Sequence, residues 1–430
     1  MRLPDLDGRR VAIWGTGREG LAALKACPSA LFAVDDNATT DTWEGIPVYT
    51  DPARLAEAEI VIKSPGISPH RPVVVALKAQ GVTFTSGTAL WMAANSGRTI
   101  GITGSKGKST TSNLIHRLLT AAGHPNTLGG NIGIPMLDLP DSDLYVVELS
   151  SYMCSELTVS PRVAVVTALF PDHLDWHGSE EQYFQDKLNI LWHGPAAAVI
   201  DGLDHRLTTL AGEGPILANQ PGTFHVTGEG FFRGTEFLFP RSAFRLLGEH
   251  NARNLCTALT AIEAFGVAYD WARLAEAVSA IEPLPHRLTE VPDPSALTFV
   301  DDSLATTPQA AIAAIEAFPG RPLTLLVGGA DRGVDYSPLR AYFAGRAEPA
   351  TVIGLPDSGP RILGELAGLP GVKALLAEDL ADAVRQARVL TPDGGIVLMS
   401  PAAPSYGKFS NYEHRSAVFR EAIEDSAPPA

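Results

Sequence analysis

The stretch Thr103-Gly-Ser-Lys-Gly-Lys-Ser-Thr110 decides the fold of this 430-residue chain. It follows an apolar run, Thr99–Thr103, which is typical of a β-strand. It precedes a segment with apolar residues at Leu114, Ile115 and Leu118, the spacing of an amphipathic helix. Glycines between a strand and a helix let backbone N–H groups surround phosphate oxygens, and the helix N-terminus adds positive potential. The sequence therefore predicts a phosphate-binding loop of the short form G-x-x-G-K-S.

Two side chains of this loop carry the expected chemistry. We expect Lys108 to reach the terminal phosphates of a nucleotide and Ser109 to ligate Mg²⁺. The alternative is a glycine-rich turn with a solvated lysine. The residues expected to contact ATP here are Gly104, Ser105, Lys106, Gly107, Lys108, Ser109 and Thr110.

The composition bounds the possible partners and compartment. With 33 Lys and Arg against 48 Asp and Glu, the formal net charge is −15, which argues against nucleic-acid binding through a general basic surface. Cys27, Cys154 and Cys256 have no metal-ligand spacing and indicate a reducing compartment. We find neither a signal peptide nor an apolar run of the ~20 residues that span a bilayer. We therefore expect a cytoplasmic monomer that binds neither nucleic acid nor membrane.

Short apolar runs alternate with helical patterns, which favours α/β units with parallel sheets. We predict three domains in series: a Rossmann-like domain at 1–96, a central P-loop ATPase-like domain at 97–284 and a second Rossmann-like domain at 285–430. Short runs at 224–226, 231–232, 236–239 and 244–246 predict a small antiparallel sheet in the central domain. The other predicted strands are 11–14, 31–34, 60–63, 82–85, 99–103, 145–149, 163–169, 197–200, 297–300, 323–327, 351–353 and 396–398.

A second glycine motif, Gly15-Thr-Gly-Arg-Glu-Gly20, follows the first predicted strand, and Asp35 follows the next one. Taken alone, this pattern fits a dinucleotide-binding fingerprint and suggests a dehydrogenase. The same geometry can hold another nucleotide diphosphate, or it can be only a tight turn. Two phosphate-binding motifs in one chain favour a nucleotide-linked substrate together with ATP.

Charged residues follow the strands that we expect beside the phosphate loop. Glu148 ends one strand and can hold Mg²⁺, and His173 lies in Asp172-His-Leu-Asp175 after the next strand. Neighbouring parallel strands deliver such groups to one edge of the sheet. Lys187 follows on a predicted helix and, without further information, would be interpreted as a surface lysine.

The last third of the chain repeats the pattern of polar strand ends. Asp302, the Gly328-Gly-Ala-Asp-Arg332 turn and the Ser400-Pro-Ala-Ala-Pro-Ser405 loop each follow a predicted strand. Hydroxyl groups and cations at strand ends suit a ribose or a small carboxylate, although such loops are common in general.

Taken in order, these motifs resemble those of the Mur ligases of bacterial cell-wall synthesis. The chain is most similar to the branch that adds D-glutamate to UDP-N-acetylmuramoyl-L-alanine, and the resemblance spans nearly its whole length. The matching segments are the 15–20 turn, Ser64-Pro-Gly-Ile67, Gly104–Ser109, Gly129-Gly-Asn-Ile-Gly133, Glu148-Leu-Ser-Ser151, Asp172–Asp175, His250-Asn251, Leu284-Pro-His-Arg287 and Ser400-Pro-Ala402.

The resemblance implies an ATP-dependent amide ligase that works through an acyl phosphate and closes its domains over the substrates. It implies two Mg²⁺ sites, the first at Ser109 and Glu148 and the second at His173, where Lys187 is carbamylated and supplies an anionic oxygen. Lys108, His173 and Lys187 would be catalytic. Further ATP contacts would come from Asn254, Arg287 and Asp302. The UDP-substrate would contact Thr16, Gly17, Asp35, Asp36, Asn37, Gly66 and Asn131, and glutamate would contact Thr306, Arg332, Ser405 and Tyr412.

Two departures concern the amino-acid site. Leu304 and Arg332 each stand where a lysine is usual in the D-glutamate-adding branch. Arginine grips a carboxylate differently from lysine. The same fold adding L-glutamate or another amino acid is therefore an alternative. An NAD-dependent dehydrogenase and a non-catalytic nucleotide-binding homologue are alternatives from other classes.

Overall fold

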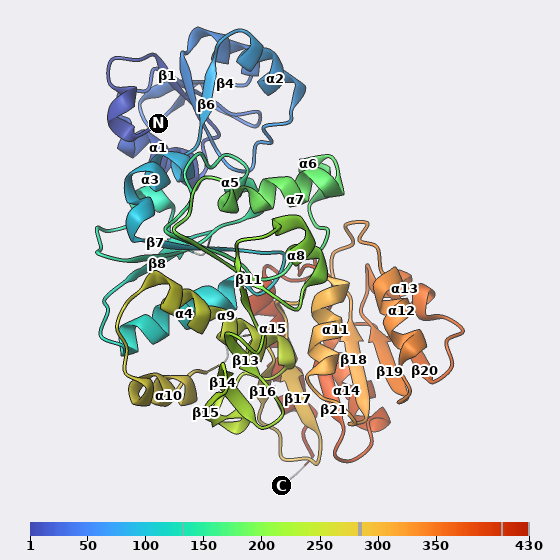
Figure 1. Cartoon of the computed structure of the whole chain (residues 1–430). Coiled ribbons are helices and arrows are strands. Elements are labelled where there is room, and N and C mark those ends of the chain that lie inside the picture. The colour runs from blue at the N-terminus through green and yellow to red at the C-terminus, as the bar shows by residue number, and fades with distance from the viewer. Residues whose placement is uncertain (132, 283–285, 406, 429–430) are drawn as a thin grey trace. The chain divides into compact units, whose positions relative to one another are not determined.

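A computed structural model describes residues 1–131, 133–282, 286–405 and 407–428 (Figure 1). The chain divides into two compact units. Unit 1 consists of Met1–Phe244 and Arg253–Ala280, and unit 2 of Arg245–Ala252 and Ile281–Ala430. The described strands form two six-stranded sheets and a three-stranded sheet in unit 1, and one six-stranded sheet in unit 2. The predicted α/β class is confirmed.

The first sheet of unit 1 has the strand order β3-β4-β2-β1-β5-β6, and only the β3–β4 pair is antiparallel. Separate apolar clusters cover its two faces, as expected for parallel strands buried on both sides. The strands are β1 (Val11–Trp14), β2 (Phe32–Val34), β3 (Thr42–Trp43), β4 (Ile46–Tyr49), β5 (Ile60–Lys63) and β6 (Thr83–Thr85). The helices are α1 (Arg18–Ala26), α2 (Pro72–Ala79) and α3 (Gly87–Asn95).

The second sheet of unit 1 is parallel throughout, with the order β12-β11-β10-β7-β9-β8. Because β7 lies between β10 and β9, the segments that follow these three strands meet at one edge. The strands are β7 (Thr99–Thr103), β8 (Thr127–Gly130), β9 (Tyr145–Glu148), β10 (Val163–Val166), β11 (Ala197–Asp201) and β12 (Ile216–Ala218). The helices are α4 (Lys108–Ala121), α5 (Ser151–Cys154), α6 (Leu174–His177), α7 (Glu180–Leu188), α8 (His205–Ala211), α9 (Glu249–Phe265) and α10 (Trp271–Ser279).

The predicted small antiparallel sheet is present, with three strands, β13 (Phe224–Val226), β14 (Gly230–Arg233) and β15 (Glu236–Pro240). The predicted fourth strand at 244–246 is wrong. A 3-10 turn at Arg241–Ala243 follows Pro240 and takes the chain out of the sheet. Phe244 and Leu246 are apolar because they are buried, not because they pair with a strand.

Unit 2 contains a sheet of order β16-β17-β21-β18-β19-β20, in which only β16–β17 is antiparallel. Two apolar clusters pack on its faces. The strands are β16 (Thr289–Val291), β17 (Thr298–Asp301), β18 (Leu323–Val327), β19 (Ala350–Gly354), β20 (Val372–Leu376) and β21 (Ile396–Met399). The helices are α11 (Pro308–Glu316), α12 (Ser337–Gly345), α13 (Gly359–Leu366), α14 (Leu380–Leu390) and α15 (Tyr412–Asp425).

The boundaries of the three predicted domains stay a prediction. The first boundary, at 96/97, lies inside unit 1, where each side carries its own sheet. The second, at 284/285, lies outside the described residues, as do Ile132, Leu284 and Pro285 of the quoted motifs. Among the described helices, none is long and apolar enough to cross a membrane.

Candidate active site

At two positions of the loop between β7 and α4, the backbone conformation and the neighbouring atoms require glycine. Gly104 has φ 147°, and a Cβ atom there would lie 2.1 Å from Thr167 Oγ1. Gly107 has φ 86°, and its Cβ would lie 2.6 Å from Asn254 Oδ1. Both glycines are therefore required by conformation and by close approach. The predicted ATP contact Asn254, which is 147 residues further along the chain, lies directly against this loop.

Two predicted residues converge on the carboxylate of a third, Glu148, at the end of β9. Ser109 Oγ donates a hydrogen bond to Glu148 Oε2 at 2.7 Å, and Asn131 Nδ2 donates to Glu148 Oε1 at 2.7 Å. Glu148 is buried. A hydroxyl group and a carboxylate in contact beside a phosphate loop form the hard oxygen set that suits Mg²⁺.

Two lysines share one acceptor in the loop. Lys108 Nζ donates to the carbonyl oxygens of Gly104, at 2.9 Å, and Ser105, at 3.4 Å. Lys187 Nζ, which comes from α7, donates to the same Gly104 oxygen at 3.0 Å. Lys187 is only 2% exposed, so its interpretation as a surface lysine is wrong. Burial and then the charge of Lys108 lower the pKa of Lys187 to about 7.

His173 lies where the segment after β10 turns into α6. It takes the left-handed conformation, with φ 53°, at the N-cap of this short helix. Its side chain is half exposed, and its Nε2 atom is 3.7 Å from Asp172 Oδ2. Burial and the charges of Lys187 and Lys108 lower the pKa of His173, against the opposing charge of Asp172. The charges of the two lysines thus act on His173. The second metal site at His173 and Lys187 stays a prediction.

Ser105 differs from the other loop residues because it faces the interior. Its hydroxyl donates to the carbonyl oxygen of Phe170 at 2.7 Å and lies 2.8 Å from Tyr183 Oη. Its backbone N–H donates to the carbonyl oxygen of Ala168 at 2.8 Å. These bonds tie the loop to the segment after β10, so the structure gives Ser105 a positioning role.

The first glycine motif forms the predicted tight turn between β1 and α1. Gly15 has φ 99°, and a Cβ on Gly20 would lie 1.9 Å from the carbonyl oxygen of Gly15. Asp35 Oδ2 accepts hydrogen bonds from Thr16 N, at 2.8 Å, and from Thr16 Oγ1, at 2.7 Å. Asn37 N donates to Asp35 Oδ1 at 2.9 Å. The Asp35 carboxylate is therefore engaged with the turn itself.

A cavity of about 350 Å³ opens beside this turn, within unit 1. Its lining includes three predicted substrate residues, Gly17, Gly66 and Asn131. Thr16, Asp35, Asp36 and Asn37 are not part of the lining; they lie at the neighbouring strand ends. The lining residues that sequence reasoning missed include Arg18, Glu19, Ser64, Ser150 and Tyr152.

Two missed residues of this cavity lie in or directly after the Glu148-Leu-Ser-Ser151 motif, Ser150 within it and Tyr152 after it. Ser150 caps α5 by accepting a hydrogen bond from Met153 N at 3.2 Å. The ring of Tyr152 stacks on Trp176, with 4.3 Å between ring centroids. Trp176 Nε1 in turn donates to the carbonyl oxygen of Gly66 at 2.9 Å. The aromatic pair of Tyr152 and Trp176 thus connects the segments that follow Ser151 and Asp175 to the Gly66 loop, a contact that no local pattern indicates.

In unit 2, the predicted ATP contact Asp302 lies directly after β17. Asp302 is buried and accepts a hydrogen bond from Ser400 Oγ at 2.8 Å. Burial raises the pKa of Asp302 to about 7, although the charge of Arg287 and the Ser400 hydrogen bond oppose the shift.

The predicted glutamate residues lie on the loops after β17, β18 and β21. Two of these loops touch: Ala330 N donates to the carbonyl oxygen of Pro404 at 2.8 Å. The buried Arg415 donates to the carbonyl oxygens of Ser303, at 2.7 Å, and Ala403, at 3.1 Å, and so holds two of the loops. The residues themselves are Thr306, half-buried; Arg332, exposed; Ser405, buried; and Tyr412, exposed at the start of α15.

Comparisons with known proteins agree with this geometry. The family model of the Mur ligase middle domain matches residues 102–216. A UDP-N-acetylmuramoyl-L-alanine–L-glutamate ligase from a Micromonospora species is 56% identical and aligns with 99% of both chains. The ligase of the same name from Xanthomonas axonopodis pathovar citri is 41% identical over 98% of this chain and 96% of that protein. Among solved structures, the Thermotoga maritima MurF ligase in complex with ADP superimposes with a TM-score of 0.59, at 16% identity over 98% of this chain and 97% of that one.

Proposed function

The chain belongs to the Mur ligase family, and on that premise we propose that it joins L-glutamate to UDP-N-acetylmuramoyl-L-alanine at the expense of ATP, in peptidoglycan precursor synthesis. The observation that carries the proposal is the convergence of the glycine loop, Glu148 and Lys187 at the edge formed by β7, β9 and β10. The dehydrogenase alternative leaves this convergence unexplained. Two of the three substrates, ATP and the UDP-linked precursor, are nucleotides of the cell interior, which supports a cytoplasmic location.

ATP would bind at the loop of residues 104–109. The backbone there suits phosphate oxygens, and Asn254 and the N-terminus of α4 lie beside it. Ser109 and Glu148 offer the oxygen ligands of a first Mg²⁺ site. When bound, Mg²⁺ offsets the negative charge of the phosphates. Lys108 supplies a further cation on the same loop.

Lys187 fits the carbamate that the family resemblance implies. Carbamylation needs a neutral amine, and burial lowers the pKa of this amine to about 7. Its Nζ lies on the phosphate loop, 3.0 Å from the carbonyl oxygen of Gly104. A carbamate there would convert a buried cation into an anionic oxygen ligand. Together with His173, it would hold a second Mg²⁺.

The UDP-substrate would occupy the cavity beside the first glycine turn. Gly17 and Gly66 leave open space there, because a Cβ on either would meet nothing within 4 Å. The Arg18 side chain lines the cavity and offers a cation for an anionic ligand. Asn131 lines the same cavity and also holds Glu148, so it connects the substrate cavity to the metal carboxylate.

The chemistry follows from the groups held in place. The carboxylate of the nucleotide-linked alanine attacks the γ-phosphorus of ATP, and the bond to ADP breaks to give an acyl phosphate. The unprotonated amine of glutamate then attacks the acyl carbon, and phosphate leaves from the tetrahedral intermediate. Three anionic reactants take part, so charge neutralisation by Lys108 and the helix N-terminus is the main contribution of the chain.

The choice between the glutamate enantiomers departs from the first expectation. The sequence motifs favoured D-glutamate, with L-glutamate as an alternative. The relatives at 56% and 41% identity are named for L-glutamate. Leu304 and Arg332, the two departures from the D-glutamate pattern, support the same conclusion. We therefore propose L-glutamate.

The test measures phosphate release by the full chain with ATP, Mg²⁺, UDP-N-acetylmuramoyl-L-alanine and a panel of amino acids that includes both glutamate enantiomers. We expect release with L-glutamate that stops when Mg²⁺ is chelated, and a product with the mass of the dipeptide nucleotide. Release with D-glutamate alone would overturn the proposed specificity for L-glutamate but not the proposed ligase activity. If no amino acid caused phosphate release, the proposed ligase activity itself would be overturned.

A further inference from the structure

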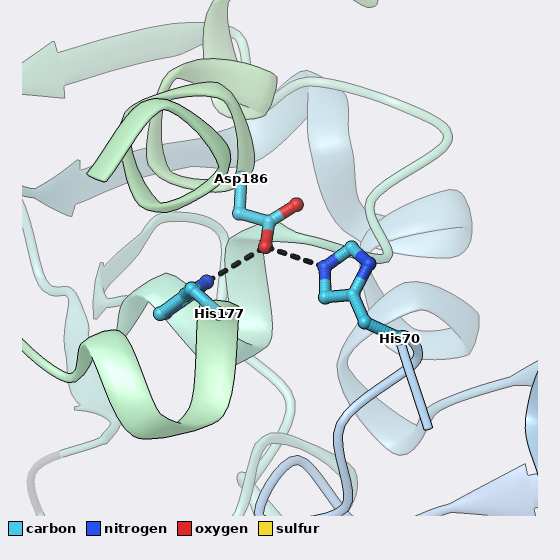
Figure 2. A group of neighbouring side chains, drawn as sticks. All are labelled: His70, His177 and Asp186. Carbon is cyan, nitrogen blue, oxygen red and sulfur yellow. Dashed lines mark hydrogen bonds and ion pairs between the residues drawn. The ribbon is translucent and has the colours of Figure 1, made fainter. Parts of the chain in front are cut away.

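Three side chains outside the proposed ATP site point their ligand atoms at one place (Figure 2). His70 Nε2 lies 2.9 Å from Asp186 Oδ2, and His177 Nδ1 lies 2.7 Å from the same oxygen. All three ligand atoms are within 4.8 Å of one another. Among the described residues, this is the one such group of three His, Cys, Asp or Glu side chains.

The hydrogen-bond partners of His177 and Asp186 also resemble those found around metal ligands. His177 Nε2, on the far side of the ring, lies 3.0 Å from Ser151 Oγ. The other oxygen of Asp186, Oδ1, accepts a hydrogen bond from Gln182 Nε2 at 2.9 Å. Metal-bound imidazoles and carboxylates are usually oriented by an outer hydrogen bond of this kind. The Ser151 contact lets His177 carry its proton on Nε2 and present the lone pair of Nδ1.

Burial differs among the three residues in a way that leaves one side open. His177 and Asp186 are 2% and 6% exposed, whereas His70 is exposed on the loop that carries Gly66. Two fixed ligands and one solvent-facing ligand allow a metal to enter and leave room for a water as the fourth ligand. This arrangement suits a tetrahedral site with three protein ligands.

We propose that His70, His177 and Asp186 form a binding site for a divalent transition metal, with Zn²⁺ as the best-fitting ion. Two imidazole nitrogens and one carboxylate oxygen match the ligand preference of zinc rather than that of Mg²⁺. In a tetrahedral site, zinc bonds of about 2.1 Å place neighbouring ligand atoms about 3.4 Å apart. The present separations of 2.7 and 2.9 Å therefore need to widen by about 0.5 to 0.7 Å. The exposed His70 loop can move away from Asp186, whereas the buried His177–Asp186 pair would have to widen by small rotations of the two side chains.

The site would be separate from the ATP site although it is next to it in sequence. Asp186 and Lys187 are successive residues of α7, so their side chains leave the helix about 100° apart. A metal at Asp186 would clamp the 64–70 loop to α6 and α7. That loop lines the substrate cavity through Ser64, Pro65 and Gly66, so the metal would fix one wall of the cavity.

The test titrates the full chain with Zn²⁺ against a chromophoric chelator in excess Mg²⁺, which fills hard oxygen sites. We expect one tightly held zinc per chain. The replacements His70→Ala and Asp186→Asn should each weaken zinc binding by more than about tenfold, the smallest loss expected when metal coordination is disturbed. His70 is exposed, so its variant should fold; circular dichroism checks this.

Two controls separate this site from others. His205→Ala removes an exposed histidine at the start of α8, and His173→Ala removes the proposed magnesium ligand. Both variants should keep the tight zinc. With Co²⁺ in place of zinc, the wild type should show the visible absorption of a tetrahedral site, and His70→Ala should lose it. The proposal is overturned if the wild type holds no zinc, or if His70→Ala holds it as tightly as the wild type does.

Discussion

At the scale of single residues, the most consequential side chain is Lys187. Its amine is buried and donates a hydrogen bond to the carbonyl oxygen of Gly104. No local sequence pattern distinguishes this residue from a surface lysine. We predict that Lys187→Ala lowers kcat by about a hundred- to a thousandfold, because the proposed second magnesium loses its anionic oxygen; a loss of this size is typical of a group that stabilises charge in a transition state. The measurement is steady-state phosphate release at saturating substrates.

The same variant allows a rescue experiment. Acetate or another short carboxylate should partly restore the turnover of Lys187→Ala, since it can supply the missing oxygen ligand. Gln185→Ala, a change on the exposed side of the same helix, serves as the matched control and should keep wild-type turnover. Wild-type activity in Lys187→Ala would disprove the carbamate assignment.

A second residue-scale prediction concerns Asp302 and pH. Burial raises the pKa of this carboxyl group to about 7 in the folded chain, against 3.8 as its ordinary value. Between these two values the unfolded chain releases the proton and the folded chain keeps it. The contribution of Asp302 to stability is therefore fully present below about pH 4 and is lost as the pH rises through about 7.

Asp302→Asn removes this dependence, because asparagine does not titrate. The melting temperature of the variant, relative to the wild type, should therefore rise as the pH is raised from 5 to 8. Asp331→Asn is the control: hydrogen bonds from Arg361 and from the backbone of Gly333 hold the pKa of Asp331 below its ordinary value, so that variant should follow the wild-type profile over this range. Parallel profiles for Asp302→Asn and wild type would contradict the assigned shift.

At the scale of structural elements, the phosphate loop depends on the absence of a single Cβ atom. Gly104→Ala would place a Cβ 2.1 Å from Thr167 Oγ1 in a backbone conformation that L residues rarely adopt. We predict at least about a tenfold loss of ATP affinity, measured by calorimetry with a non-hydrolysable analogue, because the loop must shift away from the phosphates. Gly97→Ala, where a Cβ meets nothing within 4 Å, should bind as the wild type does. Equal affinities in the two variants would contradict this account of the loop.

Strands buried on both faces could be predicted from the sequence, whereas several edge strands could not. The expected bounds of β1, β5 and β18 are those of the structure, because apolar residues fill nearly all of their positions. The edge strands β3 and β20 were not predicted. Their residues are partly exposed, so they lack the apolar run that marks a central strand.

The residues of the candidate site also fall into two groups, those that the sequence indicates and those that it does not. Ser109 and Glu148 could be expected at one edge of the sheet because each follows a predicted parallel strand, and the structure joins them. Asn131, which the structure also joins to Glu148, was expected only from the family resemblance. The contact between His70 and Asp186 spans 116 residues and belongs to no motif. Such pairs depend on how two layers pack, which local sequence patterns do not encode.

At the scale of the whole molecule, the two large sheets of unit 1 are joined by a buried ion pair. Lys63 Nζ, at the end of β5, lies 2.9 Å from Glu156 Oε2, beyond α5. The Lys63 side chain has no exposed surface, and that of Glu156 is 9% exposed. Burial lowers the pKa of Lys63, and the charge of Glu156 opposes the shift. Lys63 also donates to the carbonyl oxygen of Ile67 at 2.5 Å, so it supports the loop that lines the substrate cavity.

Removal of one partner should therefore cost more than removal of both. We predict that Glu156→Ala destabilises the chain by about 3 to 5 kcal/mol, because it leaves a buried ammonium without its counter-charge. The double variant Lys63→Met with Glu156→Leu replaces the pair by apolar side chains of similar volume, and it should lose less than Glu156→Ala alone. Urea unfolding of the three proteins measures both differences. Arg54→Ala, which breaks the exposed Arg54–Glu57 pair, should change stability by less than about 1 kcal/mol. If Glu156→Ala lost no more than Arg54→Ala, the buried pair would not be what holds the two sheets together, and the apolar contacts between them would have to be sufficient on their own.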